Sequence, residues 1–145
     1  YGANLYGANL SEANLSEAYL YGARLSESNI SRAKNVCPIA LARTCVVPPE
    51  GEVVGWKKCA NGVIVKLRIP PEARRSNASS RKCRAEFVDV LEVLGADVGI
   101  SIHDSITKYY AGTRVACDNW NDDRFVECGG GIHFYITREE AEAHV

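Results

Sequence analysis

Long apolar runs and leader segments are missing from this 145-residue chain. No stretch approaches the ~18 apolar residues that a bilayer span needs, and no charged and then apolar start marks a secretion signal. We therefore predict a protein without a membrane role.

An excess of charge of one sign is also missing. The chain has 17 Lys and Arg residues against 18 Asp and Glu residues, with a net charge of −1. Nucleic-acid-binding domains usually carry a basic surface, often with aromatic side chains that stack on bases. The balanced charge and the lack of a recognisable aromatic platform therefore argue against a nucleic-acid partner.

Closely spaced metal ligands are lacking too. Structural zinc sites usually show pairs such as C-x₂₋₄-C, whereas the cysteines here are widely spread: Cys37, Cys45, Cys59, Cys83, Cys117 and Cys128. The one close spacing is Cys128 to His133, and a site would need Cys83, Cys117 or His103 to converge on it, so we predict no metal and no cofactor. Six cysteines fit three disulfides, but a hydrophobic content of 46% can build a core without them, which favours free thiols in a reducing cytosol.

What the chain does have is a five-residue repeat from Tyr1 to about Asn35, with the units YGANL, YGANL, SEANL, SEAYL, YGARL, SESNI and SRAKN. The third residue is Ala in all but one unit, and the fifth is Leu or Ile until the last. Neither a helix of 3.6 residues per turn nor a strand of period 2 keeps both positions on one face at this spacing. A solenoid does.

This segment resembles the pentapeptide-repeat proteins. In that family four units form one coil of a right-handed quadrilateral β-helix, which implies that residues twenty apart stack on one another. The sequence recurs at this distance, because Ala3 and Leu5 return as Ala23 and Leu25. We therefore predict a β-helix of under two coils over residues 1–36, with Ala and Leu pointing inward.

The predicted β-helix is too short to stand alone, since repeat proteins usually need about three stacked repeats to bury a core. The chain starts inside a complete unit and without Met, which suggests a longer solenoid before Tyr1. The first coil is expected to present open backbone donors and acceptors. Self-association, with another copy stacked on this coil, is the predicted consequence.

The period of five ends after Val36, where Pro38, Pro48, Pro49 and Gly51 follow. These residues predict a linker without regular structure over 37–52, and its apolar side chains are expected to cap the last coil. A separate domain is expected after it.

Residues 53–145 predict a small β-rich α+β domain. GVIVKLRIP alternates apolar and polar residues, and Asn61-Gly62 is a hairpin signal that joins it to VVGWKK. Further strands are predicted in VGISIHD, KYYAGTRV, RFVEC and GIHFYI, whereas RAEFVDVLEVLG fits either a strand or a helix. Thr137 and Glu140 form a T-x-x-E capping box, which predicts a short terminal helix.

This second part also resembles a known family, over essentially all of 53–145. The strings that carry the resemblance are GWKKC, VIVKLRIP, RKCRAEF, YYAGTRV and ECGGGIHFYITREEAEA. They are similar to a C-terminal domain of unknown function that commonly follows pentapeptide repeats in bacteriophage and some bacterial proteins. The resemblance implies a phage-associated protein, in the cytoplasm of the bacterial host cell or in the virion. The resemblance implies no particular activity. Repeat-bearing relatives mostly act by offering binding surfaces, so the resemblance favours a non-enzymatic protein that contacts itself or a host or phage protein.

Charge is unevenly distributed along this second part. From Lys57 to Arg84 there are nine basic residues against one acidic residue, and from Ala85 to Val145 there are twelve acidic residues against four basic ones. The basic half contains a loop with five cationic side chains: Arg74, Arg75, Arg81, Lys82 and Arg84. Guanidinium groups and hydroxyls suit a phosphate or nucleotide, so this loop is the candidate site for an anionic small molecule. In the alternative, these side chains pair with the acidic half or stay solvated.

A catalytic alternative rests on Cys128, the three glycines after it, and His133. A reactive thiol needs a base within hydrogen-bond reach, and a glycine-rich turn can leave N–H groups free for an oxyanion. Against this, His133 is predicted on the strand face opposite Ile132 and Phe134, where a structural histidine is common. The sequence therefore favours a structural or interaction protein over an enzyme, with Cys128 and His133 as the catalytic candidates.

Overall fold

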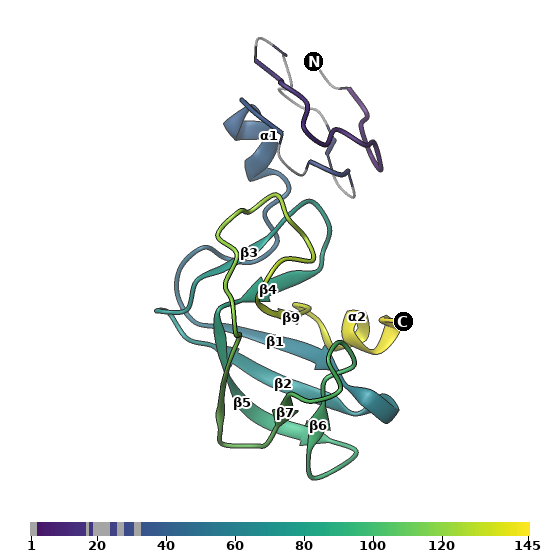
Figure 1. Cartoon of the computed structure of the whole chain (residues 1–145), viewed down its shortest axis with the longest axis vertical. Coiled ribbons are helices and arrows are strands. Elements are labelled where there is room, and N and C mark those ends of the chain that lie inside the picture. The colour runs from purple at the N-terminus through teal and green to yellow at the C-terminus, as the bar shows by residue number, and fades with distance from the viewer. Residues whose placement is uncertain (1–2, 17, 19–23, 26–27, 31–32) are drawn as a thin grey trace.

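Figure 1 shows the computed structural model of the chain, with the repeats at one end of the molecule and the β-sheets at the other. The structure describes residues 3–16, 18, 24–25, 28–30 and 33–145. It is mainly β, with short helices α1 (Pro38–Ala42) and α2 (Arg138–Ala143) and a 3-10 turn, η1 (Ala60–Gly62). Within these ranges, neither helix has the length and apolar character that a membrane crossing requires.

Parallel backbone bridges connect the repeats at the predicted distance of twenty residues. They join Asn4 to Arg24, Asn9 to Asn29 and Asn14 to Lys34. The N–H groups of Leu5, Leu10 and Leu15 donate to the carbonyl groups of Arg24, Asn29 and Lys34 at 2.9, 2.7 and 2.8 Å. The predicted recurrence at Ala23 lies outside the described residues. The described repeats therefore stack in two layers, which we call the first layer (residues 3–16 and 18) and the second layer (residues 24–25, 28–30 and 33–34).

The two layers differ in how far their apolar side chains are buried. Leu25, Ile30 and Ala33 of the second layer are buried, whereas leucines of the first layer, such as Leu10, are only partly buried. Ala40 of α1 is fully buried in the same cluster, and Phe125 from the C-terminal part packs against it. The second layer is thus covered by the rest of the chain.

The linker was predicted to lack regular structure, and this prediction is wrong for the first part of the linker. Pro38 begins α1 in the first turn of the helix, where its fixed φ and missing N–H fit a helix N-terminus. Residues 43–52 contain no helix or strand. Proline here therefore starts a helix instead of preventing one.

The described strands form three antiparallel sheets. The first has the order β1-β2-β5-β8, with the bounds β1 (Val53–Lys58), β2 (Ile64–Ile69), β5 (Phe87–Leu94) and β8 (Arg114–Ala116). The second has the order β3-β4-β9, with the bounds β3 (Arg75–Asn77), β4 (Cys83–Ala85) and β9 (Ile132–Phe134). The third pairs β6 (Gly99–Ile100) with β7 (Lys108–Tyr109). A single cluster of buried apolar residues draws on all three sheets.

Most of the predicted elements are present. The β1–β2 hairpin is confirmed, and Asn61 and Gly62 take positive φ values of 59° and 73°, as a tight hairpin turn requires. The ambiguous segment forms β4 and β5, so it is extended and not helical. Residues 124–128 form no strand, and that prediction was wrong. The capping box is confirmed, because the side chain of Thr137 accepts a hydrogen bond from the Glu140 N–H at the start of α2.

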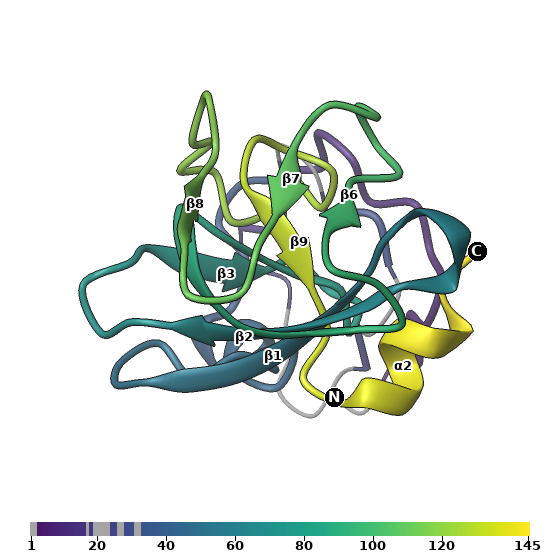
Figure 2. The same ribbon diagram turned by 90° about the horizontal axis from the view of Figure 1, so that it is seen from below.

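The sheets meet where β9 reaches β1. Trp56 and Tyr135 exchange two backbone hydrogen bonds of 2.8 and 2.7 Å, and α2 then packs beside β1 (Figure 2). Gly55 permits this approach, because a Cβ atom there would lie 2.4 Å from the ring of Phe134. The end of β1 is therefore brought next to β9 and the C-terminus.

Candidate functional site

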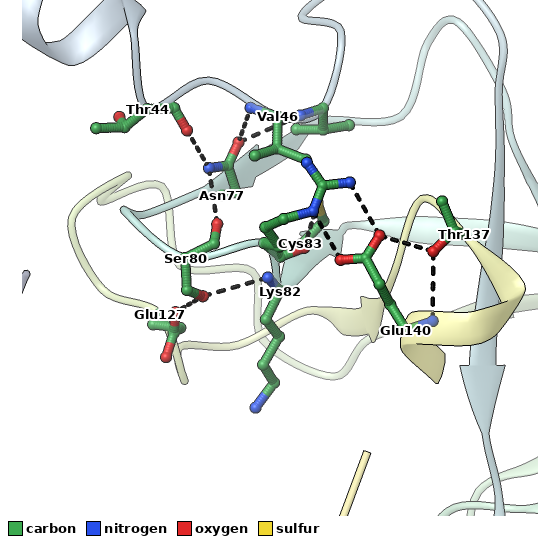
Figure 3. Close-up of polar contacts among 11 residues, drawn as sticks. Thr44, Val46, Asn77, Ser80, Lys82, Cys83, Glu127, Thr137 and Glu140 are labelled. Atoms are coloured by element: carbon green, nitrogen blue, oxygen red, sulfur yellow. Dashed lines mark hydrogen bonds and ion pairs between the residues drawn. The ribbon is translucent and has the colours of Figure 1, made fainter. Parts of the chain in front are cut away.

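The predicted anion-binding segment, from Arg74 to Arg84, includes β3, the loop after it and the start of β4, and Asn77 fixes its path (Figure 3). Asn77 is 1% exposed, and its Nδ2 donates to the carbonyl groups of Thr44 (2.6 Å) and Ser80 (3.2 Å). Its Oδ1 accepts from the N–H groups of Val46 (2.8 Å) and Val47 (3.3 Å). One amide thus ties the linker to the loop between β3 and β4.

Two of the predicted ligand residues form forked ion pairs with the acidic half of the chain. Arg74 donates to both carboxylate oxygens of Glu86 at 3.1 and 2.9 Å, and Arg81 does the same to Glu140 at 2.7 and 2.9 Å. Hydrogen bonds from these guanidinium groups lower the pKa values of both carboxyl groups. Both pairs match the alternative in which the basic half of the chain pairs with the acidic half.

Two more of these residues are engaged by backbone carbonyl groups. Arg75 donates to Gly51, Pro70 and Ala73. Arg84 is 1% exposed and its guanidinium lies 4.6 Å from the ring centroid of Trp120. It donates to the carbonyl groups of Val126 (3.1 Å), Asn121, Gly130 (2.9 Å) and Asp123 (2.6 Å). Arg84 therefore holds the long segment between β8 and β9 in place, and its role is structural.

Lys82 is arranged differently from the four arginines. Its side chain runs away from the loop network, as Figure 3 shows, and its Nζ lies 3.7 Å from the Sγ of Cys128. It points into a cavity of about 190 Å³ that we call the basic pocket. The cationic and imidazole side chains that line it are Lys57, Lys58, Lys82, His103, His133 and His144. They include all three histidines of the chain.

Several of these groups are held by hydrogen bonds. Lys57 Nζ donates to the carbonyl of His133 at 3.0 Å, and Lys58 Nζ donates to the carbonyl groups of Glu142 and His144 at 3.1 and 2.8 Å. The hydroxyl of Tyr135 lies 2.9 Å from Nδ1 of His144. The end of β1, β9 and the C-terminus of α2 thereby fix the walls of the pocket.

The close packing of these groups disfavours their charged forms. Burial lowers the pKa of Lys57; Cys59 opposes this effect, Lys82 adds to it by a smaller amount, and Asp104 opposes it by the smallest amount. Burial, followed by the positive charges of Lys82 and Lys57, lowers the pKa of His133 to about 4. Burial and the nearby lysines also lower the pKa of His144. The pocket is therefore rich in cationic groups that repel one another.

Cys128 and His133 line a second cavity of about 260 Å³ beside the basic pocket. Among the described residues no hydrogen bond joins them, and Nε2 of His133 instead donates to the carbonyl of Gly129 at 3.2 Å. An imidazole with a pKa of about 4 is a poor base at neutral pH. The arrangement does not supply the thiol–imidazole hydrogen bond that a catalytic pair uses.

The three glycines after Cys128 have a packing role. A Cβ atom on Gly130 would lie 1.5 Å from the carbonyl oxygen of Asn119, while the carbonyl of Gly130 accepts hydrogen bonds from Asn121 N and from Arg84. Glycine is therefore required for this close approach between two backbone segments. In the described part of the chain no three His, Cys, Asp or Glu side chains gather as metal ligands.

The cysteines are all free in the structure. Cys59 and Cys83 are buried, and burial raises the pKa values of their thiols to about 11 and about 12. These two side chains belong to the apolar core. They are therefore poor candidates for thiol chemistry.

Two family profiles match this chain. The profile for pentapeptide repeats (8 copies) matches residues 1–34, and the profile for a family of unknown function, DUF5758, matches residues 43–141. The chain belongs to the DUF5758 family. Both resemblances predicted from the sequence are thus confirmed. Searches of curated proteins and of solved structures found no significant match.

The DUF5758 match includes most of the basic pocket, since only His144 of its six cationic and imidazole residues lies beyond residue 141. Sequence reasoning placed its candidate anion site in the loop and did not single out Lys57, Lys58 and His144, which line the basic pocket. The pair of adjacent lysines at the end of a predicted strand was the one available signal. It does not indicate by itself which segments converge on that strand.

Titration of His133 in the DUF5758 region gives a prediction on stability. The folded-state pKa of about 4 lies below the ordinary 6.5, so the unfolded chain binds this proton more tightly. Neutral His133 therefore contributes to the free energy of unfolding above pH 6.5, and this contribution is lost as the pH falls toward 4. The loss is about 2 kcal/mol once the partial exposure of the side chain is taken into account. Urea unfolding of His133→Gln between pH 7 and pH 4 is expected to show a smaller loss of stability than the wild type.

Parallel curves for His133→Gln and the wild type would contradict the prediction.

Proposed function

We propose that this chain is a non-enzymatic interaction protein that associates with a second copy of itself through its repeats. In this proposal residues 1–36 form a short right-handed quadrilateral β-helix, 37–52 close it, and 53–145 form the C-terminal domain. The association with bacteriophage, and a place in the host cytoplasm or virion, rest on the resemblance and belong to the same proposal. The observation that carries it is the difference between the two sides of the stacked repeats.

The backbone of the first layer supports an open side. Arg24 N donates to the Ala3 carbonyl at 2.9 Å, and the Arg24 carbonyl accepts from Leu5 N at 2.9 Å. In a parallel ladder, the residue between two such partners directs its own N–H and C=O to the opposite side. The backbone groups of Asn4, and likewise those of Asn9 and Asn14, therefore point away from the second layer.

The side chains of these asparagines keep the layer in shape. Each Oδ1 accepts the N–H of the residue two positions ahead, as in the bond from Ser11 N to Asn9 at 3.1 Å and from Ser16 N to Asn14 at 3.0 Å. The leucines between them are partly buried in the first layer. The open side thus presents regularly spaced backbone groups around partly buried leucines, which is the surface that another coil of the same kind would complement.

Negative charge on the asparagines of the first layer is expected to weaken the association. In the double variant Asn9→Asp, Asn14→Asp the carboxylate oxygens still accept the turn hydrogen bonds, so the layer keeps its shape. Two copies stacked by their first layers would bring these carboxylates together, and like charges in contact oppose binding strongly. Light scattering and native mass spectrometry should show a dimer of the wild type, and at least about tenfold weaker dimerisation of the variant.

Asn29→Asp is the matched control, because it makes the same change in the second layer, away from the open side. This variant should dimerise as the wild type does. A wild type that stays monomeric at all concentrations, or equal weakening by all of these changes, would contradict the proposal.

A further inference from the structure

The basic pocket collects positive charge from segments that are far apart in the sequence. Lys57 and Lys58 end β1, His133 lies in β9, and His144 follows α2. Lys82 comes from the β3–β4 loop, and His103 comes from the turn after β6. A surface patch of solvated lysines would not require this convergence.

Three acidic groups around the pocket have hydrogen-bond or ion-pair partners of their own, although the charge of Asp104 still acts on Lys57. Asp104 accepts hydrogen bonds from Ile106 N, Thr107 N and Thr107 Oγ1. The carboxylate of Glu142 pairs with Arg138 at 2.7 Å, while only its backbone carbonyl reaches Lys58. Glu140 is paired with Arg81. None of the described residues that line the pocket is Asp or Glu.

The cations are also arranged to hold a ligand. The ammonium groups of Lys57 and Lys58 each donate to backbone carbonyl groups, which fixes their positions. An ammonium has three N–H donors, so Lys57 retains donors for a ligand. Lys82, with its weak 3.7 Å contact to Cys128 Sγ, can turn toward the same point.

We propose that the basic pocket binds a phosphate-bearing small molecule. Its phosphate oxygens accept hydrogen bonds from Lys57, Lys82 and the imidazole of His144, and its negative charge removes the repulsion between these groups. Tyr135 and Ile102 supply the apolar part of the wall, against which the remainder of the ligand packs. This site is independent of the stacking of the repeats.

Isothermal titration calorimetry with inorganic pyrophosphate tests this site on the whole chain. One pyrophosphate per chain is expected to bind to the wild type, and Lys82→Ala should weaken binding roughly tenfold through the loss of a charge-assisted hydrogen bond. Lys66→Ala removes the same charge from the face of β2, where Lys66 lies over the ring of Trp56, and should leave the affinity unchanged within twofold.

Proton linkage supplies a second measurement. Because the free pocket disfavours protonated His133 and His144, pyrophosphate should draw protons onto them at pH 6. The heat of binding should then differ between buffers of different ionisation enthalpy. The imidazole signals of both histidines should also move in NMR spectra during the titration.

Three results would overturn the proposal. The first is the absence of heat and of imidazole shifts at millimolar pyrophosphate. The second is equal weakening by Lys82→Ala and Lys66→Ala, which would indicate binding through net charge alone. The third is loss of binding in Arg74→Ala with no effect of Lys82→Ala, which would place the ligand on the arginine loop.

Discussion

Replacing Arg84 by Met is expected to lower the free energy of unfolding by about 4 kcal/mol, because the four hydrogen bonds from its buried guanidinium to backbone carbonyl groups are lost. Arg84 is buried to 1% exposure under the segment between β8 and β9. Methionine has a similar length but no donor, so it cannot replace these hydrogen bonds. The segment contains Gly130, which lies close to Asn119, and its order depends on the same guanidinium.

Urea unfolding of the Arg84→Met variant measures this effect, with Arg81→Met as the matched control. The side chain of Arg81 is 55% exposed in its pair with Glu140, and exposed ion pairs contribute less than about 1 kcal/mol. Loss of stability in both variants by similar amounts would show that Arg84 does not have the structural role assigned to it.

Asn77→Asp is expected to lower the free energy of unfolding by about 3 kcal/mol at pH 7. In the wild type, Nδ2 of Asn77 donates to the carbonyl groups of Thr44 and Ser80. A carboxylate oxygen in that place would face these carbonyl oxygens as a buried, unpaired charge. The Nδ2 bond to the Thr44 carbonyl of the linker would be lost with it, whereas the bonds from the N–H groups of Val46 and Val47 need only an acceptor and would remain.

The pH dependence of the Asn77→Asp variant distinguishes destabilisation by the new negative charge from destabilisation by the lost hydrogen-bond donor. A carboxyl group that faces carbonyl oxygens keeps its proton to a higher pH in the folded state than in the unfolded chain. The destabilisation is therefore complete well above the folded-state pKa and is relieved as the pH falls from the folded-state pKa to the unfolded-state pKa of about 4. Asn61→Asp, at an exposed turn position, should show little change at either pH, and a pH-independent loss in Asn77→Asp would contradict this account.

Local patterns in the sequence predicted much of the fold. The alternation in GVIVKLRIP gave β2, the Asn61-Gly62 pair gave the turn before it, and the Thr137 capping box gave α2. Each of these signals acts over fewer than about ten residues, so no long-range information was needed. The spacing of twenty residues in the repeats was also visible, because it is a property of the sequence itself.

The sites could not be predicted in the same way. Arg74 and Arg84 look equivalent in the sequence, yet one is a surface partner of Glu86 and the other is buried among carbonyl groups. Which of the two occurs depends on where the segment between β8 and β9 folds back. Likewise, the residues of the basic pocket come from separated segments, and only the pairing of β9 with β4 and the contact of Tyr135 with β1 bring them together.

The covering of the second layer by α1 and Phe125 has a consequence for assembly. A stack of coils with two free ends could add copies without limit and grow into a filament. In the association proposed above, two copies meet through their first layers and leave their covered second layers outside. Such a pair is closed by twofold symmetry, and in that proposal the five-residue helix α1 (Pro38–Ala42) limits its size.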